Sequence, residues 1–93
     1  MDIEEARRII NEVDEQLVPL FIRRMKASEQ IAAYKSMNGL PTRDMTREKE
    51  IMDRVALGAE EALQPYVREL YGVLFSLSRR YQDQLRGAPS GPV

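Results

Sequence analysis

Two apolar tracks in the first third of the chain, each repeating every seven residues, constrain the fold most strongly. One track consists of Ile3, Ile10, Leu17, Arg24 and Ile31, and the other of Ala6, Val13, Leu20, Ala27 and Tyr34. Residues at this spacing form one stripe along an α-helix. The pattern predicts a long helix from Ile3 to about Met37, capped by Asp2 and ended by Asn38 and Gly39.

Pro19 is the one residue that conflicts with this helix. Inside a helix, proline removes a hydrogen bond and costs about 3 kcal/mol. We therefore expect a bend near residues 15–19, or two helices in line.

Two further helices are indicated downstream. Asp44 can cap the second, which should end at Gly58. The third should begin near Leu63 with Pro65 in its first turn. Its apolar residues alternate spacings of three and four: Val67, Leu70, Leu74, Leu77, Tyr81 and Leu85.

These patterns predict an all-α fold, with residues 1–86 as one helical domain of three helices and residues 87–93 as a flexible tail. A first helix of about 35 residues spans roughly 50 Å, whereas a compact globule of this size has a radius of gyration near ~12 Å. Because the apolar seam continues along the overhang, we expect an intertwined antiparallel homodimer. A plain three-helix bundle with a bent first helix is the alternative.

Composition excludes several classes of function. The 93 residues include no Cys and no His, which excludes thiol nucleophiles, Ser-His-Asp triads and the usual zinc sites. With 14 Lys plus Arg against 15 Asp plus Glu, no global basic field attracts nucleic acid, and Arg79 with Arg80 is best explained as a solvated helix face. No apolar run approaches the ~20 residues of a membrane span. We expect a cytoplasmic protein that binds neither nucleic acid nor membrane.

Arg24 places a permanent charge in the apolar seam, where it needs either a carboxylate of the protein or an anionic ligand. Lys35 lies on the same face about 16 Å away, so both side chains can lean toward one small ligand. Arg7 is about 25 Å from Arg24 along the helix, so one small ligand cannot contact both residues of the same chain. An antiparallel partner could bring its Arg7 alongside, although a solvated charge or an ion pair with Asp14 or Glu4 would also explain this residue.

Polar residues on the other helices form a second candidate set. Asp44, Arg47 and Glu48 lie at the start of the second helix, where capping explains part of the pattern and the helix dipole favours anions. Ser78 and Gln82 replace apolar residues on the buried stripe of the third helix. They could form a hydrogen-bond network between helices or contact a ligand.

Over residues 2 to about 86 the chain resembles the all-helical class of chorismate mutase. The matching positions are Arg7, residues 12–17, Arg23, Arg24, residues 31–35, residues 40–44, Arg47, Glu48, Ser78 and Gln82. Members of this family are intertwined homodimers of three-helix chains, in which each active site borrows one arginine from the other protomer. The resemblance implies that Arg7 is this arginine.

The resemblance also implies roles for the remaining residues. Arg24 and the partner's Arg7 would bind the two carboxylates of chorismate, with Ser78 beside a carboxylate. Lys35 and Gln82 would donate to the ether oxygen.

Asp44 and Glu48 would hold the ring hydroxyl, supported by Arg47. Arg79 departs from the family pattern, because an apolar residue is expected at this position facing the pocket. We therefore expect the wall of the pocket or its net charge to differ.

The implied activity is the rearrangement of chorismate to prephenate, which requires no metal, no cofactor and no proton transfer. Two alternatives differ from it in chemistry. One is an isochorismate-pyruvate lyase of the same fold. The other is a non-catalytic helical dimer or regulatory domain in which Arg24 pairs with Glu48 or another carboxylate.

Overall fold

The computed structural model describes residues 2–87 as an all-helical chain. Its elements are α1 (Ile3–Met37), α2 (Met45–Leu57), the 3₁₀ turn η1 (Glu61–Leu63) and α3 (Gln64–Leu85). The predicted three helices are confirmed, and the described range contains no strand. None of these helices combines the length and the apolar character that crossing a membrane demands. Apart from Gly87, the predicted tail lies outside the described residues.

The helix ends follow from local hydrogen bonding. Asp2 accepts a hydrogen bond from the backbone of Glu5 at 2.8 Å, and Asp44 accepts one from the backbone of Arg47 at 3.0 Å. At the end of α1, Gly39 has φ +63°, a left-handed conformation that suits glycine. The next amide, of Leu40, then returns to the carbonyl of Lys35 at 2.8 Å.

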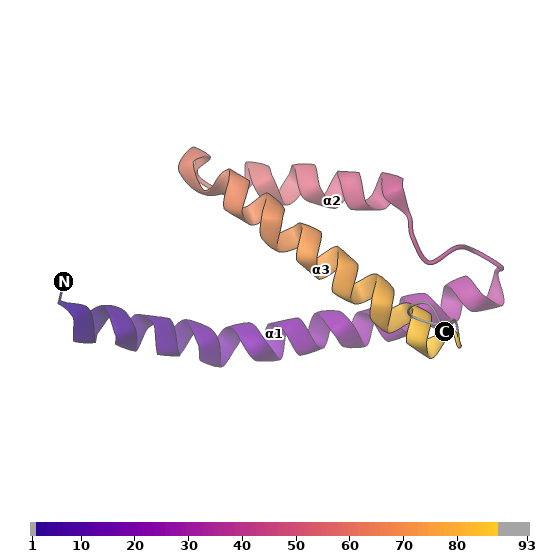
Figure 1. The fold of residues 1–93 in the computed structure, drawn as a ribbon, viewed down its shortest axis with the longest axis horizontal. Helices are drawn as coiled ribbons and strands as arrows, with labels where there is room; N and C mark the ends of the chain where they lie inside the picture. The colour runs from indigo at the N-terminus through magenta and orange to yellow at the C-terminus, as the bar shows by residue number, and fades with distance from the viewer. Residues whose placement is uncertain (1, 88–93) are drawn as a thin grey trace.

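Pro19 does not divide the first helix. α1 runs without interruption from Ile3 to Met37, so the alternative of two helices in line is wrong, and Figure 1 shows a continuous, gently curved ribbon. Pro19 and Glu15, whose carbonyl loses its donor, are both exposed. Because water can satisfy that carbonyl, the missing bond is tolerated within the helix.

α3 is the element that joins the other two helices. It packs against both α1 and α2, whereas the backbones of α1 and α2 do not approach each other closely. Figure 1 shows α3 crossing from the end of α2 to the C-terminal half of α1. The buried apolar residues lie near these crossings: Ala32, Ala56 and Phe75.

The N-terminal half of α1 projects beyond the rest of the chain (Figure 1). The molecule measures 53 × 25 × 25 Å, with a radius of gyration of 16.3 Å, well above the ~12 Å of a compact chain of this length. Apolar side chains on this overhang are 52% to 63% exposed: Ile3, Ile10, Val13, Leu17 and Leu20. A single chain thus leaves half of its predicted seam uncovered.

Candidate active site

A cavity of about 430 Å³ lies beside α3, with lining residues from α1, from the loop before α2 and from α2 itself. Seven of the eight residues selected from the sequence line it: Arg24, Lys35, Asp44, Arg47, Glu48, Ser78 and Gln82. These residues span positions 24 to 82, so the fold brings together side chains that are far apart in the sequence. The eighth residue, Arg7, lies elsewhere.

The cavity lining carries more positive than negative charge. Its lining contains two carboxylates, those of Asp44 and Glu48, and five cations: Arg24, Lys35, Arg47, Arg54 and Arg79. The whole chain has a formal net charge of −1. The excess of cations is therefore local, which is the arrangement that attracts a small anion to one concave site.

Arg24 lies against aromatic rings of α3. Its guanidinium carbon is 5.8 Å from the ring centroids of both Tyr71 and Phe75. Aromatic faces attract a guanidinium without neutralising it. Within residues 2–87 Arg24 forms no ion pair with a carboxylate, and Glu48 instead pairs with Arg79 and Arg43. This geometry contradicts the alternative in which Arg24 forms an ion pair with Glu48.

Glu48 is held by the residue that departs from the family pattern. Arg79 Nη1 lies 2.6 Å from Glu48 Oε2, and Arg43 Nε lies 3.7 Å from Glu48 Oε1. The side chains of Glu48 and Arg79 are only 19% and 27% exposed, so water screens their attraction incompletely. Arg79 therefore adds a cation to the cavity wall and binds one of its two carboxylates.

Lys35 is restrained from the loop between α1 and α2. Its Nζ donates a hydrogen bond to the backbone carbonyl of Thr42, which also lines the cavity. An ammonium group has three donors, so two remain for a ligand.

Ser78 and Gln82 belong to a buried hydrogen-bond chain between α3 and α1. Gln82 Nε2 donates to Ser78 Oγ at 3.0 Å, Ser78 Oγ lies 2.8 Å from Ser28 Oγ, and Ser28 Oγ donates to the carbonyl of Arg24 at 3.2 Å. Gln82 Oε1 is buried and has no partner within the described residues. The network predicted for these residues is present, and their position in the cavity lining leaves ligand contact available to Gln82.

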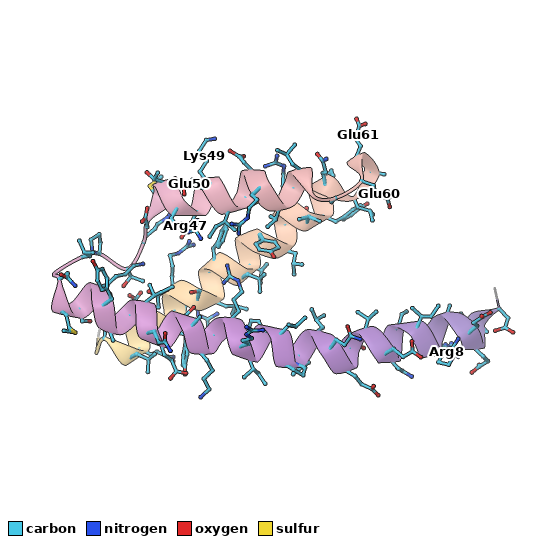
Figure 2. The ribbon with its side chains drawn as sticks, turned by 180° about the vertical axis from the view of Figure 1, so that it is seen from behind. Arg8, Arg47, Lys49, Glu50, Glu60 and Glu61 are labelled. Atoms are coloured by element: carbon cyan, nitrogen blue, oxygen red, sulfur yellow. The ribbon has the colours of Figure 1, made fainter. Side chains whose placement is uncertain are left out.

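Asp44 and Arg47 serve the start of α2 as well as the cavity. The Asp44 carboxylate caps the helix, and Arg47 Nη1 lies 3.6 Å from Glu50 Oε2. In Figure 2, Arg47 extends from α2 toward α1, whereas Lys49 extends from the opposite side. Arg47 can therefore reach the cavity while it keeps its exposed ion pair.

Arg7 directly precedes Arg8, which Figure 2 labels on the projecting half of α1. Its Nη1 is 3.5 Å from Glu4 Oε1, and the Arg7 side chain is 68% exposed. The ion pair with Glu4 that the sequence left open is thus present. An exposed pair of this kind contributes little to stability.

Several lining residues were not selected from the sequence. Arg54 lies seven residues after Arg47, and this spacing on one helix face was the signal that could have identified it. Tyr71 and Phe75 were not selected, because their contact with Arg24 depends on how α3 crosses α1. Thr42 had no distinctive local pattern.

Comparison with known proteins identifies similar sequences. A family model described as "Chorismate mutase type II" matches residues 6–83. The "Monofunctional chorismate mutase" of Enterobacter agglomerans is 26% identical over 76 residues, which cover 75% of this chain and 42% of that protein. The "Bifunctional chorismate mutase/prephenate dehydratase" of Aquifex aeolicus is 27% identical over 88 residues, covering 85% of this chain and 24% of that protein.

The "Chorismate mutase" of Methanocaldococcus jannaschii is 34% identical over 53 residues, covering 57% of this chain and 54% of that protein. The chain thus spans from about a quarter to about half of the length of these curated relatives. No solved structure matches the chain.

Proposed function

Because the chain belongs to the chorismate mutase type II family, we propose that it catalyses the rearrangement of chorismate to prephenate. The observation that carries this proposal is the single cavity in which seven of the eight implied site residues meet, with cations in excess. Chorismate is a small dianion, and a cavity of about 430 Å³ lined by five cations suits such a ligand.

The reaction is intramolecular. The ether C–O bond breaks while a C–C bond forms, and no proton is transferred. An enzyme can accelerate it by holding the substrate in a compact reactive conformer and by stabilising the negative charge that develops on the ether oxygen. Fixed donors in a concave site can supply both effects.

We assign the carboxylates of chorismate to guanidinium groups. Arg24 rests on aromatic rings without a carboxylate partner among the described residues, which supports its role as an anchor for one carboxylate. Arg7 of the partner subunit would supply the second guanidinium in an intertwined antiparallel homodimer. The exposed apolar seam of α1 supports this assembly, because a second chain would cover it. Ser78 would lie beside a carboxylate.

Lys35 and Gln82 are assigned to the ether oxygen. Lys35 keeps two ammonium hydrogens after its bond to Thr42, and Gln82 Nε2 keeps one after its bond to Ser78. Both groups are oriented by these hydrogen bonds before the substrate arrives. Such preorganised donors stabilise a developing charge with little reorganisation.

Asp44 and Glu48 are assigned to the ring hydroxyl. Glu48 Oε1 has Arg43 only at 3.7 Å, so a lone pair remains available for a hydroxyl donor. Arg47 would support this acidic pair, and Arg79 fixes the orientation of Glu48 through Oε2.

The test is to incubate the purified protein, made in a host that lacks its own chorismate mutase, with chorismate and to identify the product by chromatography. We expect prephenate to appear as chorismate disappears. The Arg24→Ala variant, purified identically, controls for contaminating enzyme. Unchanged chorismate would contradict the proposal, and release of pyruvate from isochorismate instead would identify the lyase of the same fold.

A further inference from the structure

The loop between α1 and α2 is tied to the C-terminal end of α3 by Arg86. All three nitrogens of this guanidinium are used: Nε donates to Ser36 Oγ at 3.0 Å, Nη1 to Thr42 Oγ1 at 2.9 Å and Nη2 to the carbonyl of Leu40 at 2.6 Å. A planar guanidinium imposes the directions of its bonds. Arg86 therefore orients three points of the α1–α2 connection relative to one another.

Thr42 is the centre of this arrangement. Its Oγ1 accepts from Arg86 and donates to Asp83 Oδ1 at 2.6 Å. Its backbone carbonyl accepts from Lys35 Nζ. The side chain of Thr42 is thus held by Asp83 of α3 and by Arg86, which directly follows α3, while its main chain holds Lys35.

The restraint matters because a lysine side chain is intrinsically mobile. Its four-carbon stem loses about 2 kcal/mol of rotamer entropy when it is ordered. One hydrogen bond to a fixed carbonyl reduces the positions open to Nζ and directs the two remaining donors. If the carbonyl moves, the ammonium group moves with it.

We propose that Asp83 and Arg86 are positioning residues that act through Thr42 to place the Lys35 ammonium in the cavity. Neither Asp83 nor Arg86 lines the cavity, so they act without touching the substrate. This inference rests on the proposed function, because it concerns the group assigned to the ether oxygen. It extends the site from Gln82 to Arg86, the residue that directly follows α3.

The test compares Thr42→Val and Arg86→Gln with wild type. Thr42→Val preserves shape and the backbone carbonyl but removes the hydroxyl that Asp83 and Arg86 both bind. We expect kcat to fall about tenfold in each variant, since small misplacements of a catalytic group are costly. KM should stay within about twofold, because the carboxylate anchors are untouched. Thr42→Ser retains the hydroxyl and should restore kcat.

Arg80→Gln is the matched control. Arg80 lies on the same helix, is exposed, and forms no ion pair or side-chain hydrogen bond within residues 2–87. Hydrogen exchange provides a readout independent of turnover: amides of residues 38–44 should exchange faster in Thr42→Val and Arg86→Gln, and at the wild-type rate in Arg80→Gln. Urea unfolding establishes that every assay contains folded protein.

The outcomes separate the two proposals. A wild-type protein that leaves chorismate unchanged would overturn the proposed function. An active wild type whose kcat is unaffected by Thr42→Val and Arg86→Gln would overturn the positioning role alone, even if stability falls. Loss of kcat with faster exchange in the loop, reversed in Thr42→Ser, is the result that the positioning role predicts.

Discussion

Arg79 Nη1 lies 2.6 Å from Glu48 Oε2, and this ion pair connects α3 to α2 across 31 positions of sequence. It places one of the four arginines that line the cavity against Glu48, the carboxylate assigned to the substrate hydroxyl. The pair therefore serves both the packing of α2 and the orientation of Glu48.

Replacing Arg79 should weaken the fold measurably. In Arg79→Leu, the largely buried Glu48 carboxylate loses its close partner and keeps only Arg43 at 3.7 Å. We therefore expect the free energy of unfolding to fall by about 1–2 kcal/mol. A double-mutant cycle with Glu48→Gln, followed by urea unfolding, should give a coupling of about 1 kcal/mol. Additive effects of the two substitutions would show that the pair contributes nothing.

Lys35 should matter for turnover far more than for stability. Lys35→Met keeps the apolar stem and removes the charge and its donors, so we expect kcat to fall by about 10²- to 10³-fold. Steady-state assays with chorismate measure this loss. Lys49→Met is the control, because Lys49 is exposed and pairs only with Asp53 among the described residues. A near wild-type kcat in Lys35→Met would show that Lys35 has no role in catalysis.

Tyr81 predicts a pH dependence of stability. Its hydroxyl donates to Glu29 Oε2 at 3.0 Å, and this bond, together with burial and the negative charge of Glu29, raises the pKa of Tyr81 above its ordinary 10.0. Because the folded pKa exceeds the unfolded one, the stabilisation is complete below about pH 10 and is lost as the pH rises through the folded value.

The measurement is urea unfolding of wild type and Tyr81→Phe across alkaline pH. The difference in unfolding free energy should be constant from about pH 7 to 9 and should shrink at higher pH. Tyr66→Phe serves as the control, since Tyr66 is exposed. A difference that persists unchanged well above pH 10 would exclude Tyr81 as the titrating group.

The helices were predictable because their signals are local. Asp2 and Asp44 cap the helices that they were expected to cap, and Gly58 follows the end of α2. The alternative of two helices in line at Pro19 was wrong, since propensity alone does not reveal that the affected carbonyl is exposed and can bind water. The turn η1 was missed because three residues provide no periodicity.

The composition of the cavity was predictable only in part. Arg24, Ser78 and Gln82 stand out as polar residues on apolar stripes, which is a signal within one helix. The bonds from Arg79 to Glu48 and from Arg86 to Thr42 join residues 31 and 44 positions apart. Such contacts depend on the crossing of helices, and no local pattern encodes them.

In the proposed homodimer, each site combines one protomer's Arg24 and Lys35 with Arg7 of the partner subunit. Arg7→Ala and Arg24→Ala chains should each have little activity as pure proteins. Refolded together, half of the dimers would be mixed and would hold one intact site, so about a quarter of wild-type activity should return.

The mixture of Arg24→Ala with Lys35→Ala chains is the control, because both residues belong to the same protomer's site and neither site of a mixed dimer is intact. The most direct measurement is therefore the chorismate mutase activity of the refolded Arg7→Ala and Arg24→Ala mixture. Recovery to about a quarter of wild-type activity, with none in the control mixture, is the predicted result. Activity that stays at the average of the two parent proteins would contradict the shared site.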